Sequence, residues 1–557
     1  MNIIFEHLII FLQISLLCLF LTISGFLLKK AVLNIDDNTN YEENGIFGFI
    51  FIGFISLVIN FLYPLTIYVN NALFIIIIIF SYKFKFFNQS YKKLIKYTFF
   101  TSLICYILFI YSNVNTPDAL LYHLPFSKII NEHKIIVGLS NIHSRFGHIS
   151  IFQYISSFFN NSFLGTNGIL IPIGLLVSYF FIYCFKQFRN DFKKEESRIK
   201  SYFVFFILVF SLYSFNRYSG YGNDAQVHIY YFLTIIYLLD FFIINKSLHT
   251  FRKLSLVCLF TFLIKPFYAM TLVIPFLIFI MIRKNFVILR SKFFFFGLFF
   301  VFFWLLKNLL ISGCLIYPVN ATCGSNLIWY SDDTIKNSIA GEAWSKDWPN
   351  RIQKDTTAKD FNKNFNWVSS WSKTHLLVII EKLLPIFVFI LINILFLFFT
   401  KCLKKNKYER KNNFFHYALL INVFLLILWF IKFPIYRYGL SFIYIFLITL
   451  LYFIFIRYID LDKLKNYYKV FVIFIFLIFF GAITKNLFRI SDDYKQSISP
   501  SLYDQYDVGR YERVYNKDNI FTHYHKDTAC GYSLSPCTNY KTELYKKQYF
   551  NYQIYYK

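Results

Sequence analysis

Apolar segments about as long as a bilayer is thick recur along almost the whole chain, and this repetition constrains the fold more than any motif. A helix needs about 20 predominantly apolar residues to cross the hydrocarbon core. Hydrophobic residues make up 57% of the 557 residues and charged residues only 16%, which is too much apolar surface for a soluble core. We therefore expect an all-α polytopic integral membrane protein. The segments are 8–28, 46–62, 64–81, 97–112, 167–186, 201–216, 226–244, 254–282, 293–311, 376–400, 413–432, 438–457 and 468–487.

The segment 254–282 is too long for one ordinary crossing and contains Lys265 followed by Pro266. We expect it to form two short helices in a hairpin, which gives about 13 to 14 membrane segments. The basic loops then all fall on one side of the membrane, which the positive-inside rule makes the cytoplasmic side. The positions of the basic loops account for the net charge of +27, so we expect no nucleic-acid partner.

This topology divides the chain into a transmembrane domain, residues 1–487, and a small C-terminal extracytoplasmic region, residues 488–557. Two long loops of the transmembrane domain, 113–150 and 312–375, lie on the same outer side as the C-terminal region. The polar residues that could take part in catalysis or ligand binding are concentrated on this side. We therefore expect the functional site to face the outside.

Four of the nine cysteines form two closely spaced pairs on this outer side, Cys314 with Cys323 and Cys530 with Cys537. An oxidising compartment would favour a disulfide in each pair, and four free thiols are the alternative. The other cysteines lie in or beside apolar segments, where cysteine acts as a small apolar residue.

Two carboxylates stand beside apolar segments on the predicted outer side. Asp118 follows Pro117 shortly after the segment 97–112, and Asp224 directly precedes the segment 226–244. A carboxylate next to the membrane either has a chemical role, such as general base or ligand of a shared divalent cation, or caps the start of a helix. The spacing alone leaves both interpretations open for each residue.

Four cations occupy the outer ends of apolar segments or interrupt one. Arginine and lysine hold phosphate oxygens, and long basic side chains near a membrane also extend towards the interface without a ligand. Lys265 is the hardest to explain in the second way because it interrupts an apolar run. The four residues are Arg145, Lys265, Lys307 and Arg437.

Three histidines in the loop 113–150 have spacings of twenty and five residues, which match no helical metal-binding pair. His123, His143 and His148 are therefore more typical of loop hydrogen bonding or proton transfer. The same loop ends in a mixed polar and apolar stretch, 149–161. This stretch predicts either an amphipathic helix lying on the outer surface or the start of the next span.

The motif Pro117-Asp118-Ala-Leu-Leu-Tyr122-His123 resembles the outer loop of the GT-C superfamily of polytopic glycosyltransferases, in which an aspartate after an early span is followed by an aromatic pair. The run from Trp304 to Pro318, with Lys307 and Asn308 ahead of a Gly-x-x-x-x-Pro turn, is similar to a late span of that superfamily. Protein O-mannosyltransferases and aminoarabinose transferases belong to it, and the chain also resembles uncharacterised bacterial membrane proteins associated with surface polysaccharide synthesis.

The resemblance implies transfer of a sugar from a polyprenyl-phosphate-linked donor to a glycan, lipid or protein acceptor, with inversion at the anomeric carbon. The site would face the periplasm or exterior of a bacterial cytoplasmic membrane. Asp118 would be the general base and Asp224 a second catalytic carboxylate, with no cofactor required beyond a divalent cation in one alternative. The residues that would bind the substrate or its phosphate are Tyr122, His123, Arg145, His148, Lys265, Lys307 and Arg437.

Two other classes compete with this interpretation. An O-antigen-type polymerase or ligase is also polytopic, uses lipid-linked glycan and places arginine and histidine in outer loops. A transporter of lipid-linked glycan would carry out no covalent chemistry, but such proteins typically have paired broken helices near mid-membrane. Only one clear break, at Lys265-Pro266, occurs in this sequence.

Overall fold

The computed structural model describes residues 3–36, 39–84, 86, 91–109, 118–195, 197–215, 221–244, 246–282, 285–403, 413–495, 511–515, 521–525, 530–532, 535–538 and 544–557. Each predicted apolar segment corresponds to a helix, and 254–282 corresponds to two. These helices are α1 (Ile3–Leu28), α2 (Tyr41–Leu62), α3 (Ile67–Lys83), α4 (Tyr91–Phe109), α7 (Ile171–Phe192), α8 (Arg198–Ser214), α9 (Asp224–Leu239), α10 (Leu248–Ile264), α11 (Val273–Met281), α13 (Lys292–Ser312), α16 (Val368–Phe399), α17 (Asn413–Lys432), α18 (Tyr436–Tyr458) and α20 (Tyr468–Lys495).

The described residues include eight helices that are long and apolar enough to cross a membrane. The chain is therefore an α-helical polytopic membrane protein, as predicted. Three further apolar helices are shorter, and the fuller number of 13 to 14 segments stays a prediction. The eight stretches are Ile4–Leu33, Tyr41–Leu62, Ile171–Phe192, Asp224–Ile244, Lys292–Ser312, Val368–Phe399, Tyr436–Phe453 and Tyr468–Asp492.

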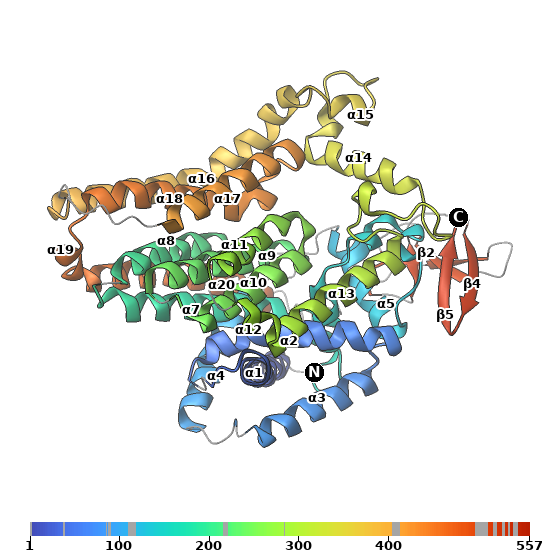
Figure 1. Ribbon diagram of the computed structural model, residues 1–557, viewed down its shortest axis with the longest axis horizontal. Coiled ribbons are helices and arrows are strands. Elements are labelled where there is room, and N and C mark those ends of the chain that lie inside the picture. Colours follow the sequence, from blue (N-terminus) through green and yellow to red (C-terminus); the bar gives the residue numbers. More distant parts are fainter. Residues whose placement is uncertain are drawn as a thin grey trace.

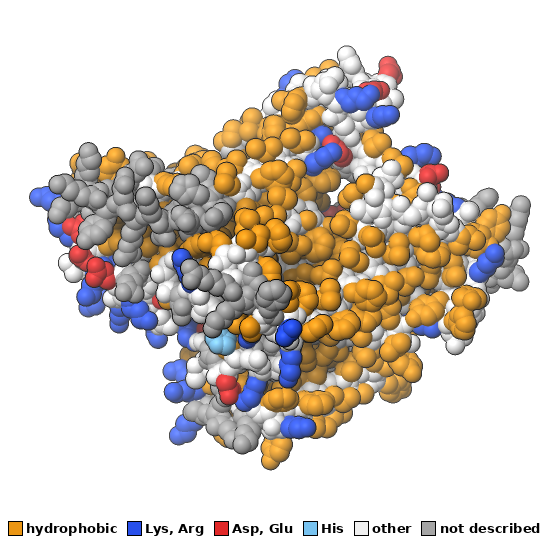
Figure 2. Space-filling view, in the orientation of Figure 1, with side chains coloured by type: hydrophobic (Ala, Val, Ile, Leu, Met, Phe, Trp, Pro, Cys, Tyr) orange, Lys and Arg blue, Asp and Glu red, His pale blue; other side chains and the backbone are white. Residues whose placement is uncertain are grey.

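The long helices run mainly along the long axis of the molecule (Figure 1). Helices α16, α17 and α18 lie along one side, α7 to α11 and α20 occupy the middle, and α1 to α4 lie along the other side. The strands and the short helices α5 (Leu124–Glu132) and α14 (Asp333–Ser345) lie at one end. Figure 2 shows a surface dominated by hydrophobic side chains, with many basic side chains at the opposite end, as expected for helices that contact lipid.

Glycines allow α1 and α2 to approach each other closely. A Cβ added at Gly25 would lie 1.7 Å from the carbonyl oxygen of Asn44, and one added at Gly48 would lie 2.1 Å from that of Leu21. Small residues at such contacts let the backbones of membrane helices pack directly. This contact fixes the N-terminal pair of helices in the bundle.

Buried ion pairs join the helices at the end opposite the strands. Lys253 pairs with Glu43 at 2.7 Å, and Lys200 pairs with Asp191 at 2.7 Å. Lys29 also contacts Glu43, and a polar cavity of about 160 Å³ adjoins this network. Charges removed from water are stable only when paired, so the pairs fix the register of the helices at this end.

Both predicted cysteine pairs are disulfides in the structure. Cys314 bonds Cys323 at the start of the loop 312–375, and Cys530 bonds Cys537 in the C-terminal region. The other five cysteines are free and buried, in agreement with their predicted packing role.

The C-terminal region forms two small sheets. In the first, β1 (Tyr511–Tyr515) pairs antiparallel with β2 (Phe521–His525), which pairs parallel with β3 (Cys537–Thr538). In the second, β4 (Tyr545–Tyr549) and β5 (Tyr552–Tyr556) form an antiparallel hairpin. The predicted extracytoplasmic region is therefore partly β-structured in its described residues.

Strand β5 docks on the loop 113–150 through its backbone. The amide of Val137 donates to the carbonyl of Gln553, and the amide of Tyr555 donates to the carbonyl of Val137, each at 2.9 Å. Tyr555 is fully buried at this contact. The C-terminal hairpin thus packs against the loop 113–150, which carries Asp118 and other candidate site residues.

The loop closed by the second disulfide contacts the same segment closer to Asp118. The amide of Gly531 donates to the carbonyl of Leu120 at 2.9 Å, and the hydroxyl of Tyr532 donates to Asn131 Oδ1 at 2.9 Å. Residues 113–117 of the loop, which include Pro117, lie outside the described residues.

Replacement of Gly138 with Ala is expected to destabilise this docking by more than about 1 kcal/mol. Gly138 has a φ of +71°, and an added Cβ would lie 2.0 Å from the carbonyl oxygen of Tyr555. The midpoint of thermal unfolding in detergent measures the effect. Gly341→Ala is the matched control, because a Cβ there meets no atom within 4 Å and the residue lies inside α14. Equal unfolding midpoints for the two variants would contradict the prediction.

Candidate active site

Two carboxylates that are far apart in the sequence converge on one guanidinium group. Arg437 Nη2 lies 3.0 Å from Asp118 Oδ2, and Arg437 Nε lies 3.8 Å from Asp224 Oδ2. Asp118 precedes a short π-helical turn, Ala119–His123, Asp224 begins α9 and Arg437 lies in the first turn of α18. Asp118 makes no side-chain capping bond at its helix start, and the cap residue of α9 is Asn223 and not Asp224. The ion pairs, and not helix capping, therefore account for the two carboxylates.

Lys265 completes the cluster from the break between α10 and α11. Its Nζ lies 2.7 Å from Asp224 Oδ1 and 3.7 Å from the ring centroid of Tyr438. Its backbone is extended, and Pro266 cannot continue the hydrogen bonding of α10. The chain therefore turns here, as predicted, and the turn presents the ammonium group to the site.

The four charged side chains are accessible as well as paired. The exposed fractions are 31% for Asp118, 34% for Asp224, 26% for Lys265 and 49% for Arg437. In the orientation of Figure 1, the surface is hollowed between the positions of α17 and α14 (Figure 2). Partly exposed ion pairs contribute only about 0 to 1 kcal/mol to stability. Stability alone therefore does not explain a cluster of two acids and two cations.

His123 and Tyr122 form one wall of the cluster. His123 is buried, and its Nδ1 lies 2.6 Å from Gln153 Nε2. Its ring lies against that of Tyr122, with centroids 4.3 Å apart. Because Gln153 donates through its amide, Nδ1 of His123 accepts and the ring proton is on Nε2 when the imidazole is neutral.

The stretch 149–161 is a short buried helix, α6 (Ile151–Phe158), and neither a surface helix nor the start of α7. The predicted outer-surface position is wrong because all residues of α6 are buried. Ser150 and Gln153 form a capping box that fixes its first turn. The same Gln153 side chain holds His123, so this helix supports the site from inside.

Arg145 and His148 lie on a neighbouring 3₁₀ turn, Ser144–His148, and are both exposed. The guanidinium of Arg145 lies 5.7 Å from the ring centroid of Tyr122. The ring of His148 packs edge-on against Tyr317, with centroids 4.8 Å apart. The structure thus places Arg145 near the wall of the cluster and His148 towards the loop 312–375.

Lys307 is separate from the cluster. Its side chain is fully buried in α13, where Nζ donates to the carbonyl of Ile149 at 3.0 Å and lies 5.0 Å from the ring centroid of Trp304. These contacts join α13 to the start of α6. The structure therefore gives Lys307 a packing role and shows no exposed ammonium for a phosphate.

Sequence reasoning missed His228, which lies one helical turn after Asp224 on α9. Its Nε2 lies 2.7 Å from the carbonyl oxygen of Arg437, and its Nδ1 lies 2.9 Å from Ser441 Oγ. Tyr268, from the turn after Lys265, contacts both His228 and Ser441 at 3.1 Å. The spacing of four residues from Asp224 was the available signal, because such residues share a helix face.

Among the described residues, no group of three or more His, Cys, Asp or Glu side chains could hold a metal ion. The nearest approach to such a site is the pair of carboxylates, and the guanidinium of Arg437 contacts both of them. The expected alternative of a shared divalent cation therefore does not fit the side chains as they are arranged here.

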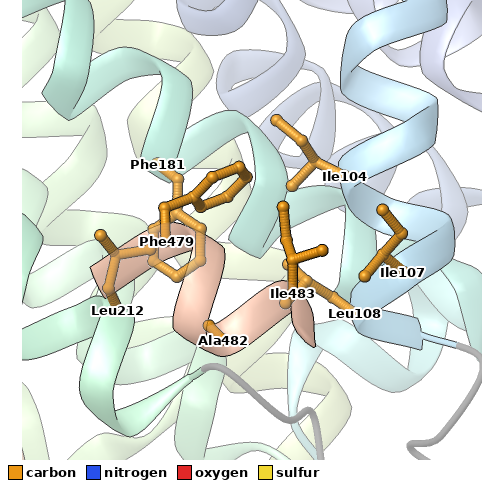
Figure 3. A pocket seen from close by; sticks show the side chains of 8 residues that line it. All are labelled: Ile104, Ile107, Leu108, Phe181, Leu212, Phe479, Ala482 and Ile483. Atoms are coloured by element: carbon orange, nitrogen blue, oxygen red, sulfur yellow. The ribbon is translucent and has the colours of Figure 1, made fainter. Parts of the chain in front are cut away.

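A separate pocket lies between α4, α7, α8 and α20 (Figure 3). Its lining contains no charged or hydrogen-bonding side chain, so it suits hydrocarbon and not a sugar or phosphate. The lining residues are Ile104, Ile107, Leu108, Phe181, Leu212, Phe479, Ala482 and Ile483.

The fold and site define a polytopic helical membrane protein with an accessible cluster of acids and cations at one end of its bundle. The chain belongs to the family described as Domain of unknown function (DUF8201), whose model matches residues 8–444. The match contains all four charged residues of the cluster and ends before the C-terminal region. No match to the chain is found among curated proteins or among solved structures.

Acid is expected to destabilise the protein through His123. Burial lowers the pKa of His123 to about 4, with Asp118 opposing the shift and Arg437 reinforcing it. Between about pH 6.5 and about pH 4, His123 is protonated in the unfolded chain but neutral in the native protein. The free energy of unfolding therefore falls as the pH decreases through this range. The loss amounts to roughly 3 kcal/mol and is absent above about pH 7. Denaturant unfolding of wild type and His123→Asn from pH 4 to 8 measures it, and equal pH dependence in both would contradict it.

Replacement of His228 with Ala is expected to lower the free energy of unfolding by about 1 to 3 kcal/mol, because the buried polar groups around it lose their partner. Thermal unfolding in detergent measures the effect. His249→Ala, at the exposed start of α10, is the control and should leave the unfolding midpoint unchanged.

Proposed function

We propose that the protein is a membrane glycosyltransferase that moves a sugar from a polyprenyl-phosphate-linked donor to a glycan, lipid or protein acceptor. The observation that carries this proposal is the convergence of Asp118 and Asp224 on Arg437, with Lys265 beside them, in an accessible position. Sugar transfer from a phosphate ester to a hydroxyl requires a base for the hydroxyl proton and positive charge for the departing phosphate. A carboxylate beside two cations supplies both.

In this mechanism Asp118 accepts the proton of the acceptor hydroxyl as its oxygen attacks the anomeric carbon. The bond between that carbon and the phosphate oxygen breaks, and its electron pair stays on the phosphate. Lys265 and Arg437 neutralise the charge that develops there. Direct displacement by the activated hydroxyl inverts the anomeric configuration.

Arg437 is suited to this role because its guanidinium has five N–H donors in a planar fork. Its observed contacts with Asp118 and Tyr438 use only part of that capacity. Asp224 lies between Lys265 and Arg437 and keeps both cations in place, so we assign it an orienting role. Tyr122, His123 and Arg145 form the adjacent wall, where the acceptor would lie.

The proposed location is the outer face of a bacterial cytoplasmic membrane. Asp224 begins α9 at the cluster, while Asp240 follows the end of α9 and pairs with Lys200 in the basic network. The cluster and the basic residues of the predicted cytoplasmic loops therefore lie at opposite ends of one helix. This polarity supports a site that faces outwards.

Deletion of the gene in its native host tests the proposal. We expect surface glycan to lose one sugar type and the polyprenyl-phosphate-linked donor to accumulate, both measured by mass spectrometry. Intact sugar composition with collapsed chain length would instead indicate the polymerase or ligase class. An unchanged glycan and an unchanged donor pool would reject the proposed function.

A further inference from the structure

The hairpin of β4 and β5 ends in an aromatic tip that the protein itself does not cover. We define the hairpin tip as residues 549–552. Tyr549 is 66% exposed and Phe550 is 79% exposed, the latter among the most exposed large hydrophobic side chains in the described residues. Large apolar side chains exposed together mark a surface that contacts something else.

The backbone at the hairpin tip makes the presence of Phe550 unusual. Phe550 and Asn551 have φ values of +45° and +61°, so both central turn residues are in the left-handed region. Two-residue turns of this kind favour asparagine and glycine, and a bulky residue there is conformationally unfavourable. The turn therefore holds a phenylalanine ring outwards at a conformational cost, with the ring edge-on against that of Tyr549 at a centroid distance of 4.5 Å and most of its surface exposed.

The hairpin tip is fixed at the level where a membrane-spanning helix ends. The hydroxyl of Tyr552 donates to the carbonyl of Phe61, one residue before the end of α2. The next residues along the chain, Leu62 and Tyr63, are also exposed. Because α2 is long and apolar enough to span the membrane, its end marks the boundary between hydrocarbon and headgroups.

Basic side chains accompany the aromatic ones. Lys134 Nζ lies 3.9 Å from the ring centroid of Tyr552 and 3.4 Å from the carbonyl oxygen of Phe550. Lys547 lies 5.3 Å from the ring centroid of Tyr556, on the hairpin face that also carries Tyr545. Aromatic rings with flanking lysines are typical of surfaces at the lipid headgroup level, where anionic phosphates attract the lysines.

We propose that the hairpin tip inserts into the lipid interface beside the end of α2. Tyr549 and Phe550 contact the glycerol and upper acyl region, and Lys134 and Lys547 face lipid phosphates. The partner is the membrane surface and not a soluble ligand. Since β5 is hydrogen bonded to Val137, this anchor also fixes the loop 113–150 relative to the bilayer. The inference does not depend on the reaction proposed above.

The test uses the full chain in proteoliposomes with a bimane fluorophore on Phe550→Cys. The wild-type chain treated in the same way corrects for its five free cysteines, which are buried. Quenching by phospholipid with a nitroxide at acyl carbon 5 is compared with quenching by aqueous iodide. Lys336→Cys is the matched control, because Lys336 is 80% exposed in the loop 312–375.

We expect nitroxide lipid to quench the label at position 550 at least twofold more than at position 336, and iodide to show the reverse order. Lys547→Ala in the same background should reduce the lipid quenching in vesicles that contain phosphatidylglycerol. Tyr549→Cys provides a second labelling position if the first variant does not fold. Iodide quenching as strong at 550 as at 336 overturns the proposal. Protection from iodide by soluble oligosaccharide alone also overturns it, and indicates a glycan-binding surface.

Discussion

Replacement of Asp118 with Asn is expected to lower sugar transfer by about 10²- to 10⁴-fold, the usual contribution of a general base. Asparagine retains the shape of the side chain and accepts a hydrogen bond from Arg437, but it cannot take the proton of the acceptor hydroxyl. The side chain is partly exposed and its ion pair contributes little to stability, so the variant should still reach the membrane. The measurement is restoration of surface glycan in a deletion strain at matched membrane levels.

Asp360→Asn is the matched control for this variant. Asp360 lies in the loop 312–375, is exposed, and pairs with the nearby Lys363 at 2.9 Å. We expect this control to restore glycan fully. Normal glycan in cells that carry Asp118→Asn would exclude Asp118 as the base, whatever the other variants do.

Replacement of Arg437 with Ala is expected to reduce transfer by at least about 10²-fold, comparable to removal of one preorganised charge-stabilising group. The change removes the cation that contacts both Asp118 and Asp224. The repulsion between the two carboxylates is then no longer neutralised by the guanidinium. It also removes the planar donor set for a phosphate. Arg437→Lys should recover only part of the activity, because an ammonium group supplies charge without the fork.

Lys432→Ala controls for the loss of a positive charge near the same end of the bundle. Lys432 ends α17, is half exposed and pairs with Glu342 at 3.0 Å, away from the two aspartates. It should leave glycan unchanged. If Arg437→Ala shortens the glycan chains without changing their composition while Asp118→Asn has no effect, the polymerase or ligase class replaces the transferase.

The helical elements could be predicted because their signals are local. An apolar run of spanning length indicates a membrane helix wherever it occurs, and the proline after Lys265 ends a helix by removing a backbone donor. The two disulfides were also predictable, since each pair is separated by fewer than ten residues. These features depend only on residues that are close together in the sequence.

The candidate site was predicted in its residue types but not in its geometry. Asp118 and Arg437 are 319 positions apart, and no sequence period relates them. Lys307 and Lys265 were both predicted to bind phosphate, Lys307 near the outer end of an apolar segment and Lys265 within one, but packing buried the first and left the second partly exposed. His228 carried no charge signal, and only the approach of α18 to α9 shows what it bonds.

The sequence by itself determined that this protein is a helical membrane protein with its reactive side chains gathered on one predicted side. Hydrophobicity decides this, because each apolar segment must leave water regardless of its neighbours. Only the tertiary structure decided which acids meet which cations, that α6 is buried beneath His123, and that the C-terminal hairpin holds the loop 113–150. Those outcomes depend on how helices pack against one another, and packing joins residues without regard to their distance along the chain.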